Sequence, residues 1–221
     1  MKILAVDTAL GALSAALLED GSVLAKAWQE MARGHAEALA PMVDAVMREA
    51  DIAYASLDRI AVTTGPGTFT GQRVGLAFAR ALALALKKPA VGITTLDAMT
   101  EEALAKTGAP WAIAASDAKR GEIYLGIGSR AGTLLAPELI AVAEAPARIA
   151  PFAEQSGKTV AICGTAAETV ASLLQQIGLD IVDSLVRQPD AVWVARLGAT
   201  EKEGVPRPLY LRPPDAKLPA S

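Results

Sequence analysis

The stretch from Ala61 to Gly75 constrains the fold more than any other part of the chain. It starts as an apolar, β-branched run typical of a buried strand, and it ends in a long apolar run typical of a helix. The corner between them is Gly65-Pro66-Gly67, in which Pro66 fixes its own φ and both glycines can adopt φ values closed to other residues. Thr68 or Thr70 can then cap the helix. Such a strand, bare loop and helix N-terminus suits an anion, a close contact with another backbone, or simply a tight turn without a ligand.

The spacing of this stretch excludes two common phosphate-binding motifs. A P-loop requires Lys and then Ser or Thr after its last glycine, whereas Gly71 is followed by Gln72 and Arg73. The dinucleotide-binding fingerprint requires a third glycine at position 70, which is Thr70. The loop therefore belongs to a different kind of protein.

The loop closely resembles the Gly-Pro-Gly-[Ser/Thr]-Phe-Thr-Gly-x-Arg-x-Gly signature of the TsaB family, the bacterial scaffold proteins of threonylcarbamoyladenosine biosynthesis on tRNA. The signature positions matched here are Gly65, Pro66, Gly67, Thr68, Phe69, Thr70, Gly71 and Arg73. Four other segments are similar to the family in the same order, namely residues 3–8, 34–37, 116–124 and 208–212. The resemblance spans essentially the whole chain.

The order of the expected elements indicates the fold class. Strands are expected over 2–7, 14–19, 23–29, 57–64 and 89–93, and helices over 35–50, 70–86 and 95–106. Three strands followed by alternating helix and strand is the order of the ribonuclease H-like fold, the building block of the actin, sugar-kinase and Hsp70 class. We therefore expect an α/β protein with two ribonuclease H-like lobes, whose mixed sheets are flanked by helices.

A break at Thr107-Gly108-Ala109-Pro110 divides the chain into a lobe over 1–106 and a reduced lobe over 107–221. In the second lobe we expect strands near 111–115, 122–127, 134–142 and 159–163, and helices over 166–176 and 190–203. The tail from Val205 is rich in proline and is expected to be extended.

Composition limits the partners and the location of the protein. The 221 residues carry a net charge of -3 and a pI near 5.3, so a basic face for tight tRNA binding is not expected, and tRNA would be met only through a complex. No apolar run approaches the ~20 residues of a membrane span, and the N-terminus lacks a signal-peptide pattern. The single cysteine, Cys163, lies in an apolar run and is expected to be a buried thiol. We therefore expect a cytoplasmic protein without a membrane partner.

The resemblance also indicates which catalytic parts are incomplete. TsaD, the catalytic homologue of the family, holds a metal through two histidines four residues apart, whereas His35 is the single histidine here and Leu39 lies four residues on. No metal or other cofactor is therefore expected. Asp7 and Thr8 resemble the first phosphate hairpin of the fold class, and Asp117 could face Asp7 across a vestigial nucleotide cleft. The alternative function is accordingly a small-molecule phosphotransferase or ATPase of the actin-like fold.

Two apolar helices remain as a surface for a partner. The first has an apolar face, and the second is apolar nearly all round except for Arg80. Either the lobe buries both sides of these helices itself, or a second protein completes a four-helix bundle on them. By the resemblance, the chain would be a non-catalytic scaffold that pairs with TsaD through these helices and works with the ATPase TsaE, or that forms a homodimer when alone. The expected contact residues are Leu39, Met42, Val43, Val46, Met47, Val74, Phe78 and Leu82.

Overall fold

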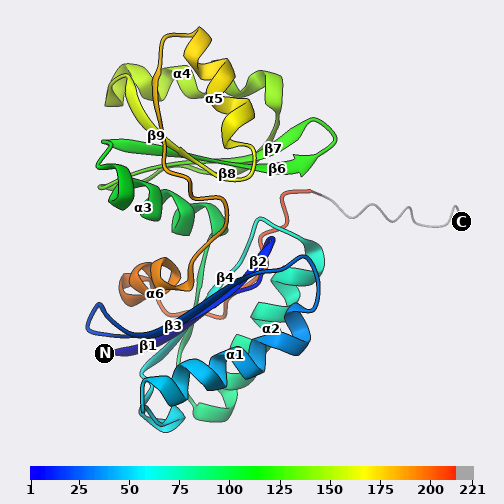
Figure 1. Cartoon of the computed structure of the whole chain (residues 1–221), viewed down its shortest axis with the longest axis vertical. Coiled ribbons are helices and arrows are strands. Elements are labelled where there is room, and N and C mark those ends of the chain that lie inside the picture. Colours follow the sequence, from blue (N-terminus) through cyan, green and yellow to red (C-terminus); the bar gives the residue numbers. More distant parts are fainter. Residues whose placement is uncertain (213–221) are drawn as a thin grey trace, which may run out of the picture.

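The computed structural model describes residues 1–212 of the chain. Figure 1 shows a stack of layers, with helices α1 and α2 at the bottom, then a lower sheet, α6 and α3, an upper sheet, and α4 and α5 at the top. Both sheets are five-stranded and mixed, with helices on both of their faces. This is the α/β, two-sheet arrangement that the order of elements predicts.

The lower sheet has the strand order β3-β2-β1-β4-β5. Strands β1, β2 and β3 form an antiparallel meander. Its second turn is Asp20-Gly21, which lies between the strands expected over 14–19 and 23–29 and has positive φ at both residues. Strand β4 then pairs in parallel with β1, so that Val62 lies opposite Val6. The bounds of the strands are Lys2–Asp7, Ala12–Glu19, Ser22–Glu30, Arg59–Thr63 and Ala90–Ile93.

The upper sheet repeats this topology, because its order is β8-β7-β6-β9-β10 when it is read from β8. The antiparallel strands are β6, β7 and β8, and β9 and β10 are added in parallel. The upper sheet is therefore as large as the lower one, although the sequence predicts a reduced second lobe. Its strands are Trp111–Lys119, Glu122–Ser129, Gly132–Ala141, Thr159–Cys163 and Asp180–Asp183.

The helices cover the sheets in a pattern that differs from chain order. Helices α1 (His35–Glu49) and α2 (Phe69–Leu86) cover the outer face of the lower sheet, and α6 (Ala191–Thr200) covers its inner face. Helix α3 (Thr95–Thr107) covers the inner face of the upper sheet, and α4 (Ala145–Ser156) and α5 (Ala167–Gln176) lie on its outer face. Short 3-10 turns occur at Tyr54–Ser56 and Val142–Glu144.

The two lobes thus exchange a helix. Helix α3 lies before the boundary at 106/107, except for its last residue, but packs on the upper sheet. Helix α6 follows the boundary but packs on the lower sheet. The boundary describes the order of the chain and not the packing. We call the lower sheet with α1, α2 and α6 the lower lobe, and the upper sheet with α3, α4 and α5 the upper lobe.

The structure corrects part of the predicted partner surface. Leu39, Val43, Val46 and Met47 are at most 2% exposed and pack in the core between α1, α2 and the lower sheet. These four side chains belong to the chain's own core, because the inward stripe of α1 meets β2 and β3 and leaves them no outer face. Met42, Val74, Phe78 and Leu82 are only partly buried against the same core.

Some local differences between expectation and structure involve prolines. Pro41 lies inside α1, which starts at His35. Helix α4 is not among the predicted elements because it contains Pro146 and Pro151, which are usual in loops, and the short edge strand β10 is also missing from them. The tail has no helix or strand over 205–211, and its last prolines, 213, 214 and 219, lie outside the described residues. Within residues 1–212, no helix is both long and apolar enough to cross a membrane.

Matched leucine substitutions test this assignment of the core. Leu39→Ala should lower the free energy of unfolding by about 2–5 kcal/mol, because it removes a side chain that is 1% exposed and leaves a cavity. Leu84→Ala on α2 is the control and should change it by less than about 0.5 kcal/mol, because Leu84 is 81% exposed. Urea unfolding measures both, and equal losses would contradict the assignment.

Candidate functional site at the ends of β1 and β4

The signature loop joins β4 to α2 and lies against the turn that follows β1. The amide of Thr68 donates to the carbonyl of Ala9 at 2.8 Å. In return, the hydroxyl of Thr8 donates to the carbonyl of Gly71 at 2.7 Å. Of the roles that the sequence leaves open for this loop, the structure shows the close contact with another backbone.

The glycines of the loop permit this contact. A Cβ on Gly67 would lie 2.3 Å from the carbonyl oxygen of Ala9, and one on Gly71 would lie 2.2 Å from that of Thr8. Gly65 has a positive φ of 99°, whereas the φ of Gly67 is not in the left-handed region, so Gly67 is required for space and not for its conformational freedom. Pro66 is buried next to them.

The start of α2 is capped as the sequence suggests. Thr68 is the N-cap, and its hydroxyl oxygen accepts from the amide of Gly71 at 3.1 Å. The exposed Thr70 lies within the first turn, so it is not the cap. Because the amides of Thr68 and Gly71 both donate within the protein, they are not available to an anion.

Asp7 is the buried acidic group of the site. It ends β1 with no exposed surface, and its Oδ1 accepts from the hydroxyl of Thr63 at 2.6 Å and from the amide of Ala9 at 3.1 Å. Its Oδ2 is also buried and has no hydrogen-bond partner among the described residues. Burial raises the pKa of Asp7 to about 7, against the lowering effect of these hydrogen bonds, and the charge of Asp190 adds to the increase.

Asp117, predicted to face Asp7, lies in a different setting. It is exposed, and its carboxylate binds Lys119 of the same hairpin, with Oδ2 at 2.7 Å from the ammonium and Oδ1 at 2.7 Å from the amide. These hydrogen bonds lower the pKa of Asp117. Alternation along β6 puts Ala114 and Ser116 toward α3, so Asp117 lies on the other face of the strand from these two.

Three other residues that the sequence singles out, Thr8, Cys163 and His35, are buried or partly buried. The hydroxyl of Thr8 is committed to the carbonyl of Gly71. Cys163 is a free, fully buried thiol as predicted, and burial raises its pKa. His35 is the first residue of α1, and among residues 1–212 no three His, Cys, Asp or Glu side chains gather in a way that could hold a metal ion.

One cluster is not deducible from the sequence. The ring of Phe69, in the loop, stacks on Tyr210 with a centroid distance of 5.6 Å. The guanidinium of Arg73 lies 3.5 Å from the centroid of Phe69, and its Nε donates to the hydroxyl of Tyr210 at 2.9 Å. The signature and the C-terminal motif are thus joined in space, although the sequence shows them only as two separate resemblances.

Substituting Gly67 tests the backbone contact. Gly67→Ala should cost about 1–3 kcal/mol of stability, because its Cβ would overlap the carbonyl of Ala9 and force the loop and the turn apart. Gly204→Ala is the control, since a Cβ there meets nothing within 4 Å. Thermal unfolding of both variants measures the difference. A Gly67→Ala protein as stable as the control would contradict the prediction, because the loop could then move away from Ala9 without loss of stability.

The raised pKa of Asp7 predicts an unusual dependence of stability on pH. Its folded pKa, about 7, exceeds the unfolded value, so the folded state binds more protons between roughly pH 4 and 7, and stability should fall as pH rises through this range. The neutral isostere Asp7→Asn should abolish this part of the decline, on the order of 2–4 kcal/mol between pH 4 and 8.

The measurement is urea unfolding of the two proteins across this range of pH. Asp51→Asn is the control, since Asp51 is exposed and its φ of 54° suits Asn as well as Asp. Parallel pH profiles for the native protein and Asp7→Asn would contradict the prediction.

Comparisons with known proteins place this arrangement in a family. The family model described as "TsaD: tRNA N6-adenosine threonylcarbamoyltransferase" matches residues 28–187. The tRNA threonylcarbamoyladenosine biosynthesis protein TsaB of Escherichia coli is 40% identical over 124 residues, which are 56% of this chain and 53% of that protein. The chain thus matches about half the length of this relative.

Solved structures extend the likeness over the whole fold. YeaZ from Pseudomonas aeruginosa superposes with a TM-score of 0.80 at 29% identity, covering 95% of this chain and 99% of that one. The ROK hexokinase of Thermus thermophilus has a TM-score of 0.51 at 12% identity over 90% of this chain and 98% of its own, which shows the fold alone. The predicted actin and sugar-kinase class is therefore confirmed. The chain belongs to the TsaB family, within the wider family of the threonylcarbamoyltransferase TsaD.

Proposed function

We propose that the protein takes part in threonylcarbamoyladenosine biosynthesis on tRNA as a non-catalytic subunit that binds a TsaD homologue and supports its activity together with TsaE. The names of the relatives support the pathway, and that pathway agrees with the expected cytoplasmic location. The partnership itself is supported by an exposed apolar face on α2, which is the single observation that carries the proposal.

This face takes the place of the four predicted contact residues that are buried in the core, namely Leu39, Val43, Val46 and Met47. Along α2, Ala77, Ala81, Leu84 and Ala85 are exposed at helical spacing, and Leu84 is 81% exposed. The exposed Arg80 lies among them, with its guanidinium bound to the carbonyl of Pro206. Phe78 and Leu82, partly buried, border it. Small residues let a second helix approach closely, and the leucine supplies the apolar anchor. The face therefore suits helices of a homologous protein, or of a second copy when the partner is absent.

Catalysis in the partner agrees with the local chemistry of this chain. A site of two histidines needs more than the single histidine of the sequence. Thr8 and Asp117, which the phosphotransferase hypothesis requires, are bound to Gly71 and Lys119 respectively. The metal and the acyl transfer would then belong to the TsaD homologue, and tRNA would be met only in the complex.

Charge insertion in the α2 face tests the partnership. Leu84→Arg should stay within about 0.5 kcal/mol of the native stability, because the residue is exposed, yet it should abolish complex formation with a TsaD homologue, because pairing would bury the charge. Sedimentation of the mixed proteins measures association, and thermal unfolding measures stability. Ile177→Arg, on the exposed end of α5, is the control and should bind normally. A folded Leu84→Arg protein that still forms the complex would contradict the interface.

The phosphotransferase or ATPase alternative rests on Asp7, whose Oδ2 is buried without a partner. ATP turnover by the purified chain alone separates the two functions. The scaffold proposal expects turnover no higher in the native protein than in Asp7→Asn. Turnover that the native protein shows and Asp7→Asn lacks would favour the enzyme.

A further inference from the structure

The last described residues, 205–212, form a segment that we call the strap. It has no regular secondary structure, yet it runs from the lower lobe to the upper lobe. We propose that the strap is an interlobe clamp, fastened along its length to the lower lobe and latched to the upper lobe by Arg212, so that this latch controls how far the lobes can move apart.

The attachment to the lower lobe is made at successive points. The Nε of Arg80 on α2 donates to the carbonyl of Pro206 at 2.9 Å. Pro206 is buried against β5, because a Cβ added to Gly92 of that strand would lie 3.1 Å from the Cβ of Pro206. The amide of Leu209 donates to the carbonyl of Thr64 at 2.8 Å, directly after β4. Tyr210 then stacks on the start of α2, as described above.

The segment that leads into the strap is also held by the lower lobe. Arg59 on β4 donates to the carbonyls of Gly198 at 2.7 Å and Glu201 at 2.9 Å, and it pairs with Glu203 at 3.3 Å. The lower lobe thus holds the chain from the end of α6 to Tyr210. The part of the strap up to Tyr210 is therefore the fixed end of the clamp.

The attachment to the upper lobe is of a different kind. The guanidinium of Arg212 donates to the carbonyl of Ala118 at 2.8 Å and pairs with the carboxylate of Glu122, both in the β6–β7 hairpin. Within residues 205–212, the strap forms its hydrogen bonds to this hairpin through the side chain of Arg212. The side chains of Arg212 and Glu122 are partly exposed, at 21% and 35%, so water and salt can compete for the pair.

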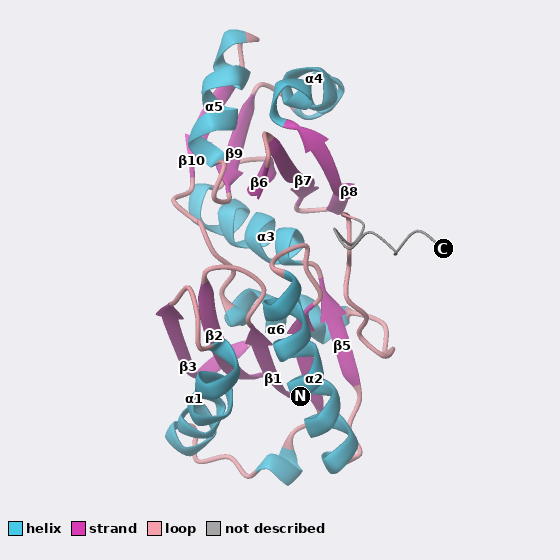
Figure 2. Cartoon of the chain, turned by 90° about the vertical axis from the view of Figure 1, so that its right-hand side faces the viewer, coloured by secondary structure: helices cyan, strands magenta, loops and turns pink. Residues whose placement is uncertain are grey.

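The other connections between the lobes lie elsewhere. The chain crosses directly from β5 to α3, and it returns through the linker over 184–190 from β10 to α6. Figure 2 shows the linker and the strap on opposite sides of the contact between the lobes. Because a clamp restrains motion best when it lies away from the hinge, the strap is well placed to control the opening of the lobes.

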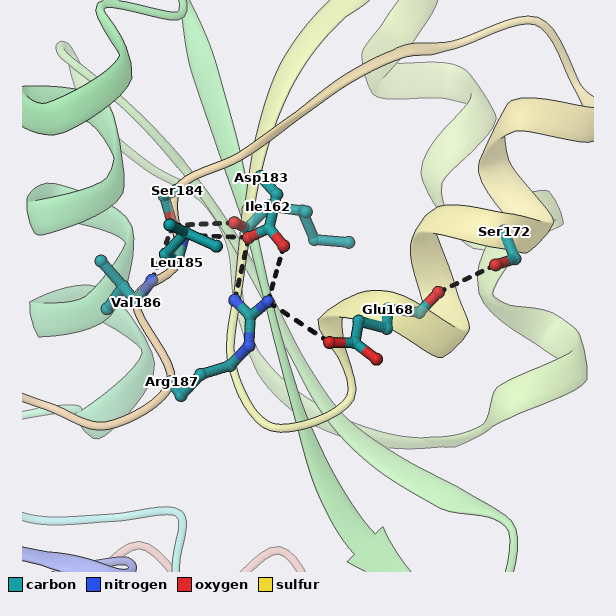
Figure 3. Close-up of polar contacts among 8 residues, drawn as sticks. All are labelled: Ile162, Glu168, Ser172, Asp183, Ser184, Leu185, Val186 and Arg187. Carbon is teal, nitrogen blue, oxygen red and sulfur yellow. Dashed lines mark hydrogen bonds and ion pairs between the residues drawn. The ribbon is translucent and has the colours of Figure 1, made fainter. Parts of the chain in front are cut away.

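Each end of the linker is bound to a different lobe, so the lobes can rotate about the middle of the linker. Figure 3 shows Arg187 binding both carboxylate oxygens of Asp183, at 2.9 and 2.6 Å, with Glu168 further away at 3.9 Å. This fixes the first half of the linker on the upper lobe. The next residue, Gln188, accepts from the amide of Gly11 at 2.9 Å and so belongs to the lower lobe. The change of lobe thus occurs between residues 187 and 188.

The experiment measures the distance between the lobes in the full chain. Spin labels at Ala45 on α1 and Gln175 on α5, both exposed, report the interlobe distance by electron paramagnetic resonance, and the buried Cys163 stays unlabelled. Arg212→Ala should give a broader distribution that extends to longer distances than in the native protein. Arg207→Ala is the control, because Arg207 is an exposed arginine of the same strap, and its distribution should match the native one.

Two further measurements separate a latch from a general loss of stability. Hydrogen exchange at the amide of Leu209 should stay slow in Arg212→Ala, because the fixed end of the clamp remains in place. In a charge-reversal pair, Arg212→Glu should broaden the distribution, and adding Glu122→Arg should narrow it again. An Arg212→Ala protein with the native distance distribution, whatever its melting temperature, would overturn the proposal, and so would failure of the second charge reversal to narrow it.

Discussion

The backbone of the signature loop lies directly against the backbone of the turn after β1, without space for a side chain between them. Gly67 and Gly71 meet the carbonyls of Ala9 and Thr8, and hydrogen bonds run in both directions across the contact. This contact fixes where α2 starts and how it leaves the sheet. The positions of Phe69 and Arg73, which hold Tyr210, depend on it, and so does the direction in which α2 presents its outer face.

The same contact accounts for the chemistry of the site. Where the fold class has a phosphate hairpin, this chain closes the region with its own groups. The hydroxyl of Thr8 donates to the carbonyl of Gly71, and the buried Asp7 accepts from the hydroxyl of Thr63. A carboxyl without solvent and with one unpartnered oxygen is favoured in its neutral form, which is the physical basis of its raised pKa. The region is thus organised for packing, which agrees with the non-catalytic role that we propose.

Local sequence patterns predicted most of the elements, and tertiary packing decided what they failed to predict. The apolar run of β1, the Asp20-Gly21 turn and the Thr68 cap depend on neighbouring residues and are readable from the chain. The exchange of α3 and α6 is not, because each helix is apolar enough to cover either sheet. The apolar stripe of α1 shows that one face of the helix is buried, but not whether the sheet or a partner protein covers it. In the structure, Leu39 and Val46 pack in the chain's own core. Asp117 was misplaced because its role depends on which face of β6 it occupies, which a motif alone does not give.

The exchanged helix also governs how the protein can form during synthesis. The inner face of the lower sheet includes Ile3 and Ala5, near the N-terminus, and it is covered by Val194 and Ala195 of α6, nearly 200 residues later by the numbering of the chain. During synthesis, the lower sheet therefore leaves the ribosome with its apolar inner face exposed. This face is covered only after α6, in the C-terminal part, has emerged. Contacts so distant in sequence slow folding and leave apolar surface exposed to other chains in the meantime. For the nascent protein, the vulnerable surface is thus the N-terminal sheet, which in the finished molecule is among the most deeply buried parts.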